Sequence, residues 1–305
     1  MTDTVVLDQV SKWFGLKVAV SEVTIGFGPG VSGLLGPNGA GKTTMMRLIA
    51  GLQRTSQGSV RVLGLDPRAD TDVFRQLSMV PEDESLYQRM SALTFVETMA
   101  RLSRLDSPRE RAERALATVN LTDASDRILG GFSKGMRQRA KVAGALVSDP
   151  QVLLLDEPLN GADPVQRAEL IRIFKDLGNS GHTVIVSSHI LAEVERMATR
   201  VVAMVDGRLA AVGDVNTIRS AMTDRPRQVF LECSDPRRMA AALMSTEGVV
   251  GVHIEPDHLR VEASDAGALA MALPGLAVTN SIEITDVKPA DESLESVFRY
   301  LVSGR

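Results

Sequence analysis

The stretch Gly36-Pro37-Asn38-Gly39-Ala40-Gly41-Lys42-Thr43-Thr44 decides the fold, because its first eight residues fit the pattern G-x-x-x-x-G-K-S/T. An apolar segment at residues 31–35 predicts a strand before it, and residues 43–52 predict a helix after it, with Met45, Met46, Ile49 and Leu52 on one face. Glycines allow backbone N–H groups to close around phosphate oxygens. We expect Lys42 to reach the β- and γ-phosphates of a nucleotide and Thr43 to bind Mg²⁺; the alternative is a glycine-rich turn that only caps a helix.

Two acidic residues follow a second apolar segment. Residues 152–155 are Val-Leu-Leu-Leu, a run without polar alternation that is typical of a central strand covered on both faces. Asp156 and Glu157 close this strand, and ligands of open α/β sheets bind at the carboxyl ends of strands. Because side chains alternate along a strand, Asp156 can hold Mg²⁺ while Glu157 orients or deprotonates the attacking water. The alternative is a pair of solvated acids in a turn before Pro158.

Two other positions can face a bound phosphate. His189 ends an apolar strand at residues 183–188 and would lie at the same sheet edge, although it could equally cap the next helix. Ser133 opens a helix expected at residues 133–148, where a hydroxyl and free N–H groups form an anion site. A plain N-cap serine explains the same local sequence equally well.

Strands and helices alternate over residues 4–220, which predicts an α/β domain with a parallel sheet and right-handed crossovers. Short strands are expected at residues 5–7 and 18–23, and helices at 164–178 and 192–198. An Arg-rich helical stretch is expected at about residues 90–120, with its buried side supplied by Leu102, Leu105, Ala112, Leu116 and Val119.

Composition narrows the function classes. The 305 residues include 34 Lys+Arg and 38 Asp+Glu, a net charge of −4, which argues against a nucleic-acid partner. The single cysteine, Cys233, excludes an internal disulfide, and no Cys/His cluster suggests zinc. The N-terminus lacks a signal peptide and no stretch of about 18 apolar residues occurs. We therefore expect an intracellular protein that reaches a membrane only through a partner.

A second domain is expected at residues 227–305, after a polar, proline-containing break at residues 224–227. Strands at 229–233, 249–254, 259–263 and 281–285, with helices between them, give the order β-α-β-β-α-β, which predicts a small α+β ferredoxin-like domain. A last helix would carry an apolar stripe at Leu294, Val297, Phe298 and Leu301, which we expect to pack on this domain.

Over roughly residues 4–220, these motifs resemble the ATP-binding subunit of an ABC transporter. Residues 36–43 match the Walker A element, and residues 153–156 with Glu157 match Walker B and its catalytic glutamate. Residues 158–163, which end at Asp163, resemble the D-loop, and residues 187–189 resemble the segment of the switch histidine. Residues 132–139 resemble the signature motif, including Ser133, Lys134 and Gly135, and Phe14 stands where the family stacks an aromatic ring on adenine. The order of the motifs along the chain matches as well.

Two positions depart from the family pattern. Glu82 stands at the Q-loop position instead of glutamine; it can bind metal through water, but it adds negative charge beside the triphosphate. Lys134 stands where the signature motif has its first glycine, so a bulky cation points away from the nucleotide or contacts phosphate. Both features, together with the C-terminal extension, resemble the ABC-2-type exporters related to drug-resistance, sodium-export and multidrug ATPases.

The resemblance implies a P-loop NTPase fold of the ABC type, a mixed-sheet core with a helical subdomain at about residues 85–148. It also implies an ATPase that uses ATP and Mg²⁺, with Glu82 among the metal-binding and nucleotide-binding residues. Two subunits, identical or paralogous, would close head-to-tail over two ATP molecules on the cytoplasmic face of the membrane and power export through a separate permease. The rivals are a soluble ABC protein of translation or DNA repair, and a nucleotide-binding regulator without turnover. One P-loop and no long coiled coil argue against the first, and Glu157 argues against the second.

Overall fold

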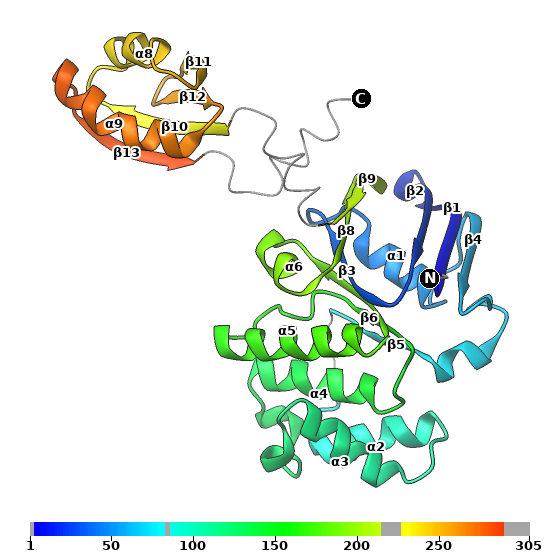
Figure 1. The fold of residues 1–305 in the computed structure, drawn as a ribbon. Helices are drawn as coiled ribbons and strands as arrows, with labels where there is room; N and C mark the ends of the chain where they lie inside the picture. Colours follow the sequence, from blue (N-terminus) through cyan, green and yellow to red (C-terminus); the bar gives the residue numbers. More distant parts are fainter. Residues whose placement is uncertain (1–2, 83–85, 215–226, 290–305) are drawn as a thin grey trace. The chain divides into compact units, whose positions relative to one another are not determined.

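The computed structural model describes residues 3–82, 86–214 and 227–289 (Figure 1). The chain divides into two compact units, Met1–Val215 and Asn216–Arg305. Each unit has its own hydrophobic core. Among the described residues, no helix combines the length and apolar character needed to cross a membrane.

A six-stranded sheet forms the centre of the first unit. Its strand order is β5-β6-β7-β3-β8-β9, and all neighbours are parallel except β8 and β9. The sheet is therefore mixed, because β8 and β9 form a hairpin around Asp206 and Gly207. The strands are β3 (Gly30–Leu35), β5 (Leu77–Val80), β6 (Val152–Leu155), β7 (Thr183–Ser188), β8 (Arg200–Val205) and β9 (Arg208–Gly213).

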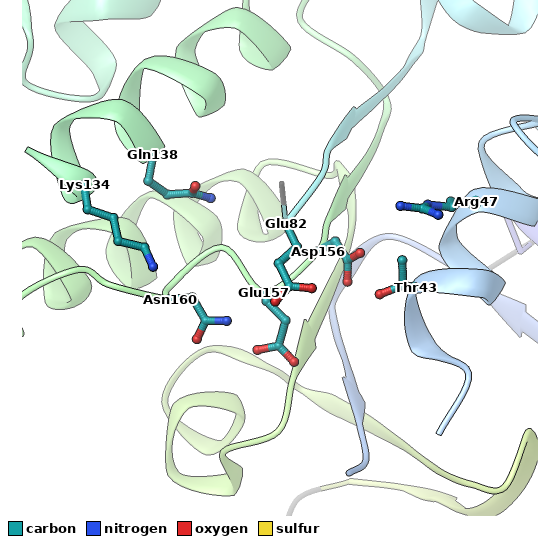
Figure 2. A pocket seen from close by; sticks show the side chains of 8 residues that line it. All are labelled: Thr43, Arg47, Glu82, Lys134, Gln138, Asp156, Glu157 and Asn160. Carbon is teal, nitrogen blue, oxygen red and sulfur yellow. The ribbon is translucent and has the colours of Figure 1, made fainter. Parts of the chain in front are cut away.

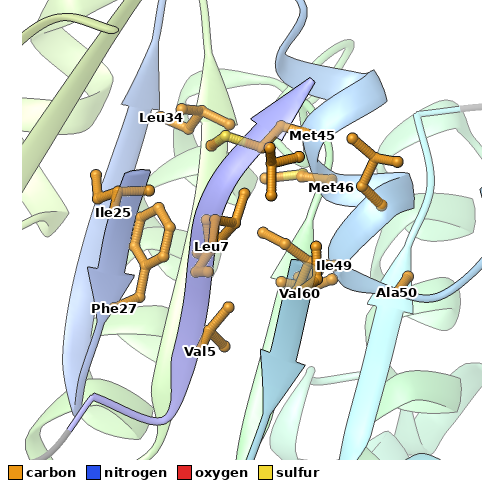
Figure 3. Packing of buried hydrophobic residues seen from close by; sticks show 14 of the residues in the cluster. Val5, Leu7, Ile25, Phe27, Leu34, Met45, Met46, Ile49, Ala50 and Val60 are labelled. Atoms are coloured by element: carbon orange, nitrogen blue, oxygen red, sulfur yellow. The ribbon is translucent and has the colours of Figure 1, made fainter. Parts of the chain in front are cut away.

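A second, antiparallel sheet has the order β2-β1-β4. Its strands are β1 (Val5–Phe14), β2 (Lys17–Phe27) and β4 (Gln57–Val62), and helix α1 (Lys42–Ile49) packs against it. Figure 3 shows the core between them, which includes Phe27 and Leu7 of the strands and Met45 and Met46 of α1. Leu52, expected on the buried face of this helix, is exposed, because α1 ends at Ile49 and the chain turns at Gly51.

Apart from α1, the described helices of the first unit form two groups. Helices α2 (Ala92–Leu102), α3 (Pro108–Thr118) and α4 (Lys134–Leu146) pack on one another, whereas α5 (Pro164–Asn179) and α6 (Leu191–Met197) pack on β3 and β7 (Figure 1). Three short 3₁₀ turns lie at Thr71–Arg75, Thr122–Ala124 and Leu129–Gly131. The stretch expected to be helical at about residues 90–120 is helical, but it consists of two helices, separated before Pro108. Leu102, expected to be buried, is exposed at the end of α2.

Over residues 227–289, the second unit has a four-stranded antiparallel sheet with the order β11-β12-β10-β13 and two helices. Along the chain it contains β10 (Arg227–Cys233), α8 (Pro236–Met244), β11 (Val249–Ile254), β12 (Leu259–Ala263), α9 (Ala266–Asn280) and β13 (Ile284–Pro289). Both helices place apolar side chains on the sheet, including Met239 and Leu243 of α8 and Leu269 and Leu273 of α9. The apolar stripe predicted at residues 294–301 lies outside the described residues.

Candidate active site

Four neighbouring parallel strands end at one edge of the central sheet, and each delivers a candidate residue there. The segment after β3 leads to Lys42, β6 leads to Asp156 and Glu157, and β7 leads to His189. The segment after β5 leads to Glu82. Because carboxyl ends of parallel strands share one edge, motifs separated by more than a hundred residues meet in one place.

The loop between β3 and α1 is closely packed. Gly41 adopts φ +101°, in the left-handed region, and a Cβ there would lie 2.3 Å from the carbonyl oxygen of Ala19, so only glycine fits. Lys42 begins α1, and its buried Nζ donates hydrogen bonds to the carbonyl oxygens of Gly36 at 2.7 Å and Pro37 at 3.2 Å. The loop is thus a preformed turn, with its lysine folded back over it.

Asp156 is held by a serine on the neighbouring strand. The Ser187 hydroxyl donates to Oδ1 of Asp156 at 2.7 Å and accepts a hydrogen bond from the Glu157 backbone N–H at 2.8 Å. Asp156 is only 1% exposed, and its Oδ2 has no hydrogen-bond partner among the described residues. A buried carboxylate oxygen without a partner is costly, and it is also a good ligand for a hard cation. The residues present therefore fit Mg²⁺.

Glu157 lies between the side chains of Lys42 and His189. It is 7% exposed, its Oε1 lies 3.5 Å from Lys42 Nζ, and its Oε2 lies 3.0 Å from His189 Nδ1. Its backbone adopts φ +46°, which is uncommon for a non-glycine residue. The two alternatives from the sequence are wrong here: Asp156 and Glu157 are buried instead of solvated, and His189 binds Glu157 instead of capping α6.

A cavity of about 450 Å³ opens beside these residues (Figure 2). Asp156 and Glu82 lie near its centre, with Thr43 on one side and Gln138 and Lys134 on the other. Gln138 is 6% exposed, and its Nε2 has no hydrogen-bond partner among the described residues. The cavity therefore combines acids, bases and amides, and its lining residues are Thr43, Arg47, Glu82, Lys134, Gln138, Asp156, Glu157 and Asn160.

The residues of the expected signature motif surround the start of α4. Ser133 caps this helix, because its Oγ accepts a hydrogen bond from the Met136 N–H at 3.2 Å. A Cβ at Gly135 would lie 1.5 Å from Oε1 of Gln166. Lys134 lies on the cavity of its own chain. Its stem passes the residue that follows Asn160: a Cβ at Gly161 would lie 2.1 Å from Cδ of Lys134.

Of the expected site residues, only Thr43, Glu82, Lys134, Asp156 and Glu157 line this cavity. Phe14, Asp163 and Ser133 are among those that lie outside it. Phe14 is exposed at the end of β1, with Lys12 Nζ 4.8 Å from the centre of its ring. Asp163 caps α5: its Oδ1 accepts hydrogen bonds from the backbone N–H groups of Val165 and Gln166. Ser133 is likewise absent from the lining.

Sequence reasoning misses several residues that the structure places at the site. In the sequence, Ser187 is recognised only as part of the segment that ends at His189. Its position at the end of the same strand, two residues before His189, could have indicated a role in the site. Gln138 lies four residues after Lys134, which puts both on one face of α4. Arg47 lies one turn after Thr43 for the same reason.

Comparisons with known proteins agree with this geometry. The family model for the ABC transporter domain matches residues 22–160. The daunorubicin/doxorubicin resistance ATP-binding protein DrrA of Streptomyces peucetius is 33% identical over 276 residues, which cover 88% of this chain and 82% of DrrA. The bacitracin transport ATP-binding protein BcrA of Enterococcus faecalis is 28% identical over 302 residues, which cover 97% and 96%. A solved ATP-binding subunit of an ABC transporter has a TM-score of 0.65 and 26% identity, covering 71% of this chain and 92% of that one.

The strand-end acids, the phosphate-binding loop and these similarities define a class, the nucleotide-binding cassettes with a P-loop. Within that class, the chain belongs to the ATP-binding subunits of ABC transporters. Its relatives include the daunorubicin/doxorubicin resistance protein and the bacitracin transport protein named above, consistent with the exporter subgroup that the sequence resembles.

Proposed function

We propose that this chain binds Mg-ATP at the edge of its central sheet and hydrolyses it, with Glu157 handling the attacking water. One observation carries the proposal: the Glu157 carboxylate lies between Lys42 and His189 and beside Asp156, at the wall of a cavity. A carboxylate held in place by an ion pair and a hydrogen bond can orient a water molecule and accept its proton.

The phosphates would be bound by the backbone N–H groups of residues 36–44 and by Lys42. The lysine already lies over the loop and needs only to exchange carbonyl partners for phosphate oxygens. Phe14, exposed at the end of β1, would stack on the adenine, as the family resemblance implies. Gly36, Pro37, Asn38, Gly39, Ala40, Gly41 and Thr44 complete the loop.

Thr43, Asp156 and Glu82 would hold the magnesium ion. All three line the same cavity, and the free Oδ2 of Asp156 supplies a ready ligand. When bound, the ion neutralises charge on the phosphates of the substrate. His189 Nδ1 would keep the Glu157 carboxylate oriented, and the charge of Lys42 would stabilise the γ-phosphate as the bond to it breaks.

A second copy, or a paralogous ATPase subunit, would complete each site. Ser133, Lys134, Gly135 and Asp163 would face the ATP held by the partner copy. Ser133 and Asp163 lie outside their own chain's cavity, and Ser133 stands at a helix N-terminus, where N–H groups favour an anion. Lys134 also lines its own cavity, so its ammonium would change partner when two copies close.

The transport partner would be a separate integral-membrane permease, with the ATPase at the cytoplasmic face and nucleic acid absent from its partners. Relatives named for daunorubicin resistance and bacitracin transport support export as the direction of transport. The cargo itself would be recognised by the permease.

Replacing Glu157 with glutamine tests this assignment. The amide keeps the shape of the side chain but is not a useful base, so the rate of phosphate release should fall by about 100-fold or more while ATP binding persists. Intact ATP should then hold two copies together, which size-exclusion chromatography detects as an ATP-dependent dimer. The double variant with Ser133→Arg should remain monomeric. Hydrolysis at the wild-type rate by Glu157→Gln would remove Glu157 from the mechanism.

A further inference from the structure

Lys141 is a buried lysine in α4 that the nucleotide site does not use directly. It is 8% exposed, and its Nζ donates hydrogen bonds to the carbonyl oxygens of Pro81 at 2.9 Å and Glu82 at 3.5 Å. A buried ammonium group is costly unless its donors find acceptors. Two of its acceptors belong to the backbone that directly follows β5.

The same backbone segment is held from its other side by β6. The carbonyl oxygen of Val80 accepts a hydrogen bond from the Asp156 N–H at 2.9 Å, so the hydrogen bonding between β5 and β6 continues to Asp156, the first acid of the site. Pro81 has no N–H of its own to anchor the turn. The turn that carries Glu82 is therefore fixed between the Asp156 backbone and the Lys141 ammonium.

Lys141 also belongs to one stripe of α4. Lys134, Gln138 and Lys141 are spaced i, i+4, i+7, and the first two line the cavity together with Glu82. The stripe starts one residue after Ser133. The helix that begins at Ser133 is thus bonded, two turns later, to the backbone of Glu82.

We propose that Lys141 is a positioning residue for Glu82: it fixes the Pro81–Glu82 backbone to α4, so that the Glu82 carboxylate stays in the metal cavity and moves together with the helix. The proposal rests on the proposed role of Glu82 in holding magnesium. Through this bond, any displacement of α4 on contact with a second copy reaches the metal site directly.

The test is the magnesium dependence of nucleotide binding, measured by calorimetric titration with a hydrolysis-resistant ATP analogue. Residues that orient metal ligands typically change metal affinity by 10–100-fold, so Lys141→Met should raise the half-saturating Mg²⁺ concentration by about tenfold. Affinity for the analogue without Mg²⁺ should stay within about twofold, because Lys42 and the loop bind the phosphates. Should Lys141→Met fail to fold by its melting curve, Lys141→Gln carries the same test.

Two further variants decide the interpretation. In the Glu82→Gln background, Lys141→Met should add less than about a twofold change, because there is no carboxylate left to position. Arg200→Met is the control: the Arg200 guanidinium also donates to a backbone carbonyl, that of Gly26 at 2.6 Å, and neither residue lines the cavity. It should leave the magnesium requirement unchanged.

Several outcomes would overturn one claim or the other. An unchanged magnesium requirement in Lys141→Met, an equal change in Arg200→Met, or a full additional change in the Glu82→Gln background contradicts the positioning role. A wild-type protein whose nucleotide binding ignores Mg²⁺, or a Glu82→Gln variant with the wild-type magnesium requirement, contradicts the proposed function instead.

Discussion

At the level of single residues, Lys42 and Glu157 form a buried ion pair that links nucleotide binding to ATP hydrolysis. We expect Lys42→Ala to reduce ATP hydrolysis by at least about 100-fold, because a positive charge is lost where the transition state accumulates negative charge. Phosphate release at saturating Mg-ATP measures the effect. Arg75→Ala is the control, since Arg75 makes only an exposed i,i+3 pair with Asp72 and should turn over normally. Full turnover by Lys42→Ala would refute the phosphate-binding assignment.

Much of the candidate site could be predicted because its residues follow strand cores that are visible in the sequence. Asp156 and Glu157 come directly after four apolar residues, and the loop that ends at Lys42 has a spacing of its own. Ser187, Gln138 and Lys141 could not be assigned in this way. Their roles depend on contacts across 31 positions for Ser187 with Asp156 and 60 for Lys141 with Pro81, which no local pattern encodes.

At the level of elements, Gly161 lies in the turn after β6 and packs against the Lys134 side chain at the start of α4. It has φ +74°, and a Cβ there would lie 2.1 Å from Cδ of Lys134. Gly161→Ala should lower the free energy of unfolding by about 1 kcal/mol through backbone strain and should also displace the Lys134 side chain from the cavity.

Gly181→Ala separates these two effects. Gly181 has φ +99°, and a Cβ added there would meet no heavy atom within 4 Å, so the substitution brings backbone strain alone. Thermal or denaturant melts should show similar losses of stability in both variants, whereas only Gly161→Ala should change ATP hydrolysis. Equal hydrolysis rates in both would mean that Lys134 has no part in the site.

The elements themselves were predictable where hydrophobic character dominates. β3, β6 and β7 are buried on both faces, and their sequences show it. β4, Gln57–Val62, contains Gln, Gly, Ser and Arg in six residues and becomes a strand because β1 pairs with it. The break between α2 and α3 is also not predicted, because helical spacing continues in the sequence although Pro108 starts a new helix.

At the scale of the whole molecule, each unit contains one residue of a type that occurs once in the chain and can report on the unfolding of that unit. Trp13, the sole tryptophan, lies in the first unit, and Cys233, the sole cysteine, lies in the second. Because the cores are separate, denaturant titrations followed by Trp13 fluorescence and by Cys233 labelling should give transitions that do not coincide. Mg-ATP should shift only the Trp13 transition, since a ligand stabilises the unit that binds it.

The environment of the Cys233 thiol predicts the direction in which its labelling rate changes on unfolding. Burial raises the pKa of Cys233 above its ordinary value, and the nearby charge of Asp235 adds to the effect, although a hydrogen bond from the Asp235 backbone opposes it. Less thiolate is therefore present in the folded unit, and labelling at pH 8 should accelerate as the second unit unfolds. Coincident transitions, or a shift of both by Mg-ATP, would show that the two units unfold as one.

The edge position of β5 has a consequence for exchange of backbone hydrogen with solvent. β5 has four residues and pairs with β6 alone, whereas β3 and β7 each have a strand on both sides. Deuterium should enter β3 and β7 only through opening of the whole first unit, and should enter β5 through a smaller, less costly opening. Because the turn after β5 carries Glu82, Mg-ATP should slow exchange in β5 more than anywhere else in the sheet, and so a weakly protected edge strand would report most directly on occupancy of the site.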